Sequence, residues 1–176
     1  PVVPDTGSLM SIELLKAPAP EIDPLEALEA VADDLALSVE RVDNDELHLA
    51  MPGLWRDAGF WFTWRAELST LQMGAPLDLK APKGRINDVA RLVAMINERL
   101  WIGHFDLWSE DSSIVFRNAA VLPADGRLDA GQAEILIKGA REAIDRFLPA
   151  FNYLIWGGKS PEEALDASMF ETAGNA

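Results

Sequence analysis

The sequence predicts an α+β fold in which an antiparallel sheet of about six strands carries helices packed mainly on one face. Apolar residues recur at helical spacing in three segments and alternate with polar residues in six others. Short turn sequences join most neighbouring strands, and strands joined in this way pair antiparallel, with one face free to meet water. The predicted order is α-β-β-β-β-α-β-β-α-α, in a single domain over residues 23–174.

Residues 1–22 are expected to form a flexible tail, because four prolines lie there among Asp, Thr, Gly and Ser. One apolar patch, at residues 12–15, could dock the tail onto the domain. The first helix is expected to start at Asp23, with Pro24 in the first helical position and Glu26 completing a capping box. It should end near Ala36.

Four strands follow, at residues 38–42, 47–51, 60–65 and 71–79. Asp43–Asn44–Asp45 provides turn residues after the first strand, and Pro52–Gly53 breaks the second. Pro76 interrupts the longest alternation in the chain, so it predicts an edge position or a bulge in the fourth strand.

The second half of the chain begins with a helix over residues 85–101, which Gly103 should stop. Strands are expected at 104–108 and 114–122. A long helix then starts near Asp129, and Pro149 should kink it. Gly157–Gly158 ends this helix, and Ser160 caps a short final one.

The composition narrows the functional classes. The formal net charge is −14 and the chain has no cysteine. A negative field of this size opposes binding to nucleic acid and to anionic membrane surfaces, and it favours a basic or apolar partner. The lack of cysteine excludes disulfides, thiolate metal sites and cysteine nucleophiles. No apolar run approaches the roughly 20 residues that span a bilayer, and no secretory signal is evident, so the expected location is the cytoplasm.

Three motifs that could indicate a phosphate, metal or calcium site lack the spacing that such sites require. Residues 157–160 read Gly-Gly-Lys-Ser, but a phosphate-binding loop needs Gly at position 153, where the chain has Tyr153, and a strand before the loop. His48 and His104 lie in separate strands without the spacing of metal ligands, although His104 could hydrogen-bond to Asp106. The acidic residues between 33 and 46 lack the spacing of a calcium loop. We therefore assign no catalytic, cofactor-binding or metal-binding residue, expect no cofactor, and predict that the protein is not an enzyme.

Tryptophan provides the candidate interface, which consists of Trp55, Trp61, Trp64, Trp101 and Trp108. Trp61 and Trp108 alternate with core residues and should lie on the opposite face of the sheet. If helices or the tail cover that face, these side chains belong to a core. If the face is free, they form an interface, where Trp is enriched.

Three stretches resemble the bacterial YbjN family: Phe60–Arg65, Asn97–Trp108 and Trp156–Leu165. The resemblance runs from about Asp23 to Gly174 and leaves the tail unmatched. It implies a domain similar to type III secretion chaperones, commonly dimeric, in a family described as sensory-transduction or stress regulators. It supplies no catalytic residue.

The favoured hypothesis is a non-catalytic protein-binding or regulatory protein, a chaperone-like homodimer in a stress or signalling response. The alternative is a small-molecule sensor with a pocket between sheet and helices, lined by Trp61, Trp64 and Trp101. An unrecognised hydrolase or nucleotide-binding enzyme is the third.

Overall fold

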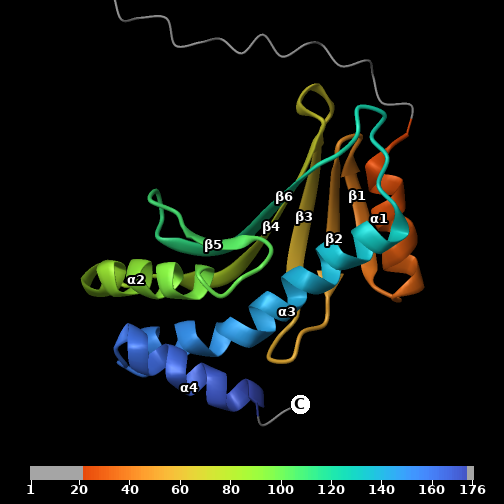
Figure 1. Ribbon diagram of the computed structural model, residues 1–176. Helices are drawn as coiled ribbons and strands as arrows, with labels where there is room; N and C mark the ends of the chain where they lie inside the picture. Colours follow the sequence, from red (N-terminus) through yellow and green to blue (C-terminus); the bar gives the residue numbers. More distant parts are fainter. Residues whose placement is uncertain (1–21, 174–176) are drawn as a thin grey trace, which may run out of the picture.

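The structure, a computed structural model, describes residues 22–173. Of the expected tail, only Ile22 is among the described residues. Gly174, at the end of the expected domain, lies outside them. Within the described residues, four α-helices and six strands occur in the predicted order (Figure 1). They are α1 (Pro24–Asp34), β1 (Ser38–Asp43), β2 (Glu46–Met51), β3 (Ala58–Arg65), β4 (Thr70–Lys80), α2 (Ile86–Asn97), β5 (His104–Leu107), β6 (Ser113–Val121), α3 (Ala130–Ile155) and α4 (Pro161–Ala173), with 3-10 turns η1 (Ala66–Leu68) and η2 (Lys83–Arg85).

The strands form one sheet in the spatial order β1-β2-β3-β4-β6-β5. Every neighbouring pair is antiparallel, which confirms the predicted sheet. The first four strands are neighbours in the order of the chain. The β5–β6 hairpin then returns so that β6 pairs with β4 and β5 becomes the outer edge.

One face of the sheet packs against the helices and forms the core. α1 contacts the first three strands and α3, while α2 contacts β5 (Figure 1). Phe105 is fully buried, and its ring lies edge-to-face with Phe116 and Phe151, at 5.3 Å between centroids in each pair. Aromatic pairs prefer this geometry because the ring edge is positive and the ring face negative. These contacts join β5 and its neighbour β6 to α3.

The start of α1 is tied to the first strand by charged groups. Asp23 caps the helix as predicted, because its Oδ1 accepts a hydrogen bond from Leu25 N at 2.9 Å. Its other carboxylate oxygen pairs with Arg41 on β1, which also donates to Glu29 at 3.3 Å. The carboxylate of Asp23 thus bonds to Leu25 and Arg41, and the predicted capping box with Glu26 is not among its contacts in the described chain.

Pro76 lies at a local edge inside the central strand β4. The pairing between β3 and β4 ends at Gly74, and the register between β4 and β6 shifts between Pro76 and Lys80. Asp78, within the shift, has a positive φ of 50°. The predicted edge or bulge is therefore confirmed, and it explains how a residue without an N–H fits an interior strand.

The second helix ends four residues earlier than the sequence predicts. α2 stops at Asn97, whose side-chain amide donates to Phe105 O at 3.0 Å and accepts from Phe105 N at 2.8 Å. Gly103 then turns the chain into β5 with a φ of +67°, and an added Cβ would lie 2.3 Å from Phe116 Cζ. Only glycine meets both conditions without strain. The segment between them leaves Trp101 on the surface.

The last two helices are joined at a well-defined corner. Asp129 and Gln132 form a capping box at the start of α3, which continues through Pro149 as one element. Ser160 and Glu163 form a second box before α4, with bonds of 3.0 Å and 3.2 Å. Arg85 donates to the carbonyl oxygens of Leu154 and Lys159, so it fixes the corner against the start of α2.

Candidate functional site

The face of the sheet opposite the core, which we call the open face, carries a row of residues that crosses all six strands. Each member lies opposite the next in the strand register. Both histidines of the chain belong to this row, one on β2 and one on β5. In order across the sheet, the row consists of Glu40, His48, Trp61, Gly74, Arg117 and His104.

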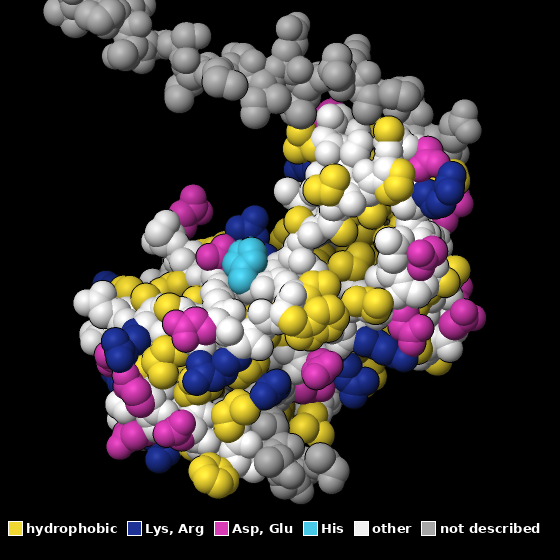
Figure 2. All heavy atoms as spheres, viewed as in Figure 1, with side chains coloured by type: hydrophobic (Ala, Val, Ile, Leu, Met, Phe, Trp, Pro, Cys, Tyr) yellow, Lys and Arg dark blue, Asp and Glu magenta, His cyan; other side chains and the backbone are white. Residues whose placement is uncertain are grey.

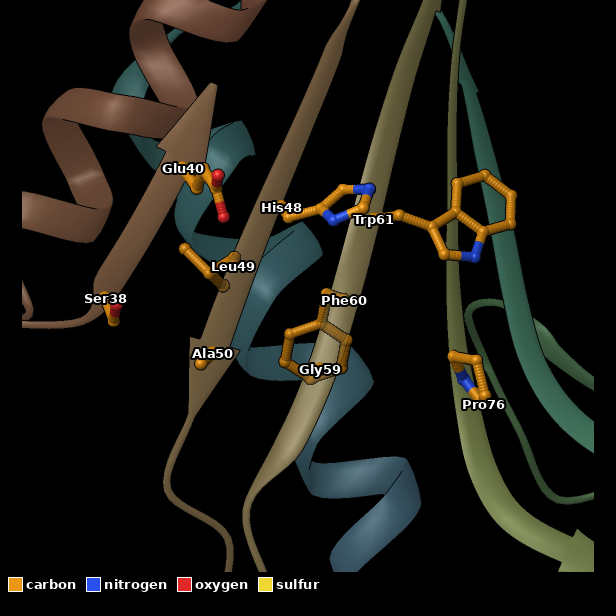
Figure 3. A pocket seen from close by; sticks show the side chains of 9 residues that line it. All are labelled: Ser38, Glu40, His48, Leu49, Ala50, Gly59, Phe60, Trp61 and Pro76. Atoms are coloured by element: carbon orange, nitrogen blue, oxygen red, sulfur yellow. The ribbon is translucent and has the colours of Figure 1, made fainter. Parts of the chain in front are cut away.

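Trp61 occupies the centre of the row in a fixed position. A Cβ added at Gly74 would lie 2.2 Å from Trp61 Cζ2, so the indole lies directly on the backbone of β4. Figure 3 shows it reaching from β3 toward β4. Because Gly74 has no side chain, the ring packs flat against the sheet, where it is half-buried, and no helix among residues 22–173 covers it. The open face thus has a preformed aromatic surface.

The histidines each have an acidic neighbour two residues away on their own strand. His48 Nε2 lies 2.6 Å from Glu46 Oε1, and His104 Nε2 lies 3.8 Å from Asp106 Oδ2. Asp106 also accepts from Arg117 Nη1 at 3.0 Å. His104 and Asp106 share one face of β5, but at 3.8 Å they do not form the predicted hydrogen bond, and the Asp106 carboxylate accepts from Arg117 instead. These exposed polar groups can bind and orient a partner's polar groups.

The structure separates the five tryptophans of the candidate interface. Trp61 and Trp108 belong to the open face, as the alternation predicts, and Trp108 is 42% exposed. Trp101 is 74% exposed beside α3. Trp55 donates from its indole Nε1 to Asp145 O at 2.7 Å, so it attaches the β2–β3 loop to α3.

Trp64 does not belong with the exposed residues, which corrects the predicted set. It is only 6% exposed and shares the core face of β3 with Phe60 and Phe62. The physical reason is the two-residue period of a strand, which places positions 60, 62 and 64 on one face and Trp61 on the other. The pocket predicted for a small-molecule sensor fails for the same reason, since Trp61 and Trp64 point to opposite faces.

Trp156 is an exposed tryptophan that the predicted interface did not include. It is 77% exposed at the C-terminal end of α3. It follows the last apolar turn of the helix and precedes Gly157. Its position just before a helix stop is the sequence signal that could have predicted its exposure.

The remaining motifs are structural. The Gly-Gly-Lys-Ser segment connects two helices, as expected for a helix stop followed by a capped start. Hydrogen bonds from the Ser160 backbone N–H and hydroxyl lower the pKa of the Glu163 carboxyl, because they stabilise its charged form.

Within residues 22–173, no three His, Asp or Glu side chains are placed to hold a metal ion.

In a comparison with known families, the model of the YbjN family, described as "Putative bacterial sensory transduction regulator", matches residues 24–152. The chain belongs to the YbjN family. The match covers the whole sheet and most of α3 but stops before α4 and before the third of the three stretches that resemble the family. The Asn97–Trp108 stretch lies inside it, and the structure explains two of its members, because Asn97 and Gly103 hold β5 in place.

Among solved structures, the YbjN protein of E. coli, described as "a putative transcription regulator", is similar to this chain at 16% identity and a TM-score of 0.49. The similarity covers 84% of this chain and 93% of that one. No curated protein matches. In the part of the chain that the structure describes, no helix is long and apolar enough to cross a membrane.

Proposed function

We propose that this member of the YbjN family is a non-catalytic cytoplasmic regulator, which acts in a sensory or stress response by binding a protein partner in a chaperone-like manner, as a homodimer. The observation that carries the proposal is the open face of the sheet. Trp61 lies there in a fixed position, not covered by any helix of the described chain, and Trp108 is on the same face. Aromatic side chains held in this way bury a large area on binding and lose little conformational freedom.

The charge of the protein supports the choice of a protein partner. The net charge of −14 repels phosphate backbones and anionic lipids. A basic or apolar protein surface meets no such repulsion, and a field of this size also speeds the approach of a basic partner.

We propose that the homodimer forms through a different surface, beside Trp101. This side chain is 74% exposed and Ile135 of α3 is 50% exposed, and the two line a cavity of about 240 Å³ with Gly139. Figure 2 shows other hydrophobic side chains exposed among charged ones. In a two-fold dimer, Trp101 of each copy would fill the cavity beside Ile135 of the other, since the same patch must serve both copies. The open face would then remain free for the partner.

Light scattering after size-exclusion chromatography tests the dimer. We expect the native protein to be dimeric at tens of micromolar, and Trp101→Ser to shift it toward the monomer. Trp156→Ser is the matched control, because Trp156 is equally exposed at 77% but lies at the far end of α3, and it should leave the dimer intact. A native monomer at this concentration would exclude the homodimer.

Affinity capture from the native cell tests partner binding, with mass spectrometry as the readout. A partner that the native protein retains and that Trp61→Ala loses supports the proposal. If Trp61→Ala and Trp108→Ala both retain every partner of the native protein, the open face is not the binding surface.

A further inference from the structure

A cavity of about 350 Å³ lies on the open face, beside the central row. Its floor is formed by Ala50 on β2 and Gly59 on β3, which lie opposite each other in the register. An added Cβ at Gly59 would have no atom of the described residues within 4 Å, so these residues leave the space above the floor free. The cavity is a trough that crosses the strands, from Ser38 on β1 to Pro76 on β4 (Figure 3).

The trough has an aromatic wall. Trp61 and Pro76 bound it on the side of β4, and Trp61 cannot settle lower because its ring already lies on Gly74. The indole is therefore in position before any ligand binds. A flat aromatic surface that needs no rearrangement attracts a cation or a planar guanidinium group.

The opposite side of the trough is acidic. Glu40 lines it and is exposed, and within the described chain its carboxylate has neither an ion pair nor a hydrogen bond from another residue. Next to it, the ring of His48 is bonded to a second carboxylate, that of Glu46. Among the residues that line the trough, none is Lys or Arg. An unpaired carboxylate opposite a fixed indole provides the two groups that recognise a cationic side chain.

The dimensions of the trough favour a peptide over a single small molecule. It spans four neighbouring strands, which corresponds to about 14 Å at the usual spacing between strands. An extended chain covers this length with about four residues.

We infer that the trough binds an extended, basic segment of a partner protein, with one Lys or Arg side chain between Trp61 and Glu40. This inference rests on the proposed function, because it names the class of partner that the open face takes. It extends that function by giving the side chain that is read and the residues that read it.

The test uses octapeptides that differ only at one central position, which is Arg, Lys, Leu or Glu, labelled with a fluorophore and titrated with the full-length protein. We expect the Arg and Lys peptides to bind at least tenfold more tightly than the Glu and Leu peptides in fluorescence anisotropy. Trp61→Ala and Glu40→Gln should each weaken the Arg peptide about fivefold or more. Glu67→Gln, an equal change of charge at an exposed residue outside the trough, should leave binding unchanged.

Gly59→Leu fills the trough from its floor and should abolish binding of the Arg peptide. The control is Gly84→Ala, because an added Cβ there also has no atom within 4 Å and the residue is far from the trough in the fold. Circular dichroism and thermal melting of both variants establish that they fold.

Three results would overturn the inference: no binding of any peptide to the native protein, equal binding of the Glu peptide, or native binding by folded Gly59→Leu. If a cellular partner captured by the native protein is also retained by Gly59→Leu, the trough fails while the proposed function stands. If no partner is captured through the open face at all, the proposed function fails. If a free polyamine, at an equal concentration of positive charge, displaces the Arg peptide from the native protein, the trough binds small amines and the inference of a peptide ligand is contradicted.

Discussion

Replacing Asn97 with Ala removes two hydrogen bonds that attach the edge strand β5 to the end of α2. The Asn97 amide bonds to both backbone polar groups of Phe105, at 3.0 Å and 2.8 Å. It thus replaces the hydrogen bonds that a further strand would make to Phe105 at this edge of the sheet. Phe105 is fully buried and contacts Phe116 and Phe151, so a loosened β5 also weakens the core.

The expected cost follows from these two bonds. Each contributes about 0.5–1.5 kcal/mol net, and unpaired backbone groups add to the loss unless water reaches them. The higher helix propensity of Ala returns about 0.5 kcal/mol. We therefore expect Asn97→Ala to lower the free energy of unfolding by about 2 kcal/mol in reversible urea denaturation followed by circular dichroism, with an unchanged m-value.

Asn97→Asp separates hydrogen bonding from packing, because it keeps the shape and the acceptor but loses the donor. A carboxylate oxygen would then face the Phe105 carbonyl oxygen at the negative end of α2, so at neutral pH the variant should be no more stable than Asn97→Ala. The control is Asn87→Ala on the exposed side of the same helix, expected within about 0.5 kcal/mol of the native protein. Native stability of Asn97→Ala, together with unchanged hydrogen exchange at the Phe105 amide, would refute the reasoning.

Two further predictions concern single residues. Asp111 has a pKa of about 2, lowered from 3.8 chiefly by hydrogen bonds from the Ser113 hydroxyl and backbone N–H, so Ser113→Ala should raise this pKa in a carboxylate NMR titration. A carboxyl whose pKa is depressed by folding stabilises the protein above pH 4 and loses that effect as the pH falls toward 2. The difference in stability between Ser113→Ala and the native protein should therefore shrink as the pH falls from 4 to 2. An unchanged pKa of Asp111 in the variant would contradict the assignment. Gly103→Ala combines a φ of +67° with a Cβ only 2.3 Å from Phe116 Cζ, and should lower the free energy of unfolding by about 2–4 kcal/mol in urea denaturation. Gly84→Ala is its control, and equal stability of the two variants would show that the contact with Phe116 relaxes without cost.

Local patterns were sufficient to predict the type and order of the helices and strands, but not every boundary. The period of two in residues 60–65 placed Trp61 on the face opposite the core residues, and the structure confirms this. The same period places Trp64 in the core with Phe60 and Phe62, although the predicted interface included it. The early end of α2 was not predictable in the same way. The apolar spacing continues to Leu100, and the helix stops at Asn97 because its side chain bonds to Phe105, eight residues ahead.

The candidate site depends on relations that periodicity does not contain. An alternating strand reveals which residues share a face, but not which strand lies beside it or in which register. The sequence by itself thus determined the class of fold, the order of the elements and the face of the sheet on which Trp61 lies. Only the tertiary structure decided that β6 lies between β4 and β5, that Gly74 supports the indole, and that Glu40, His48 and Trp61 lie in one row above an open trough, because pairing between distant strands is set by packing of the whole core.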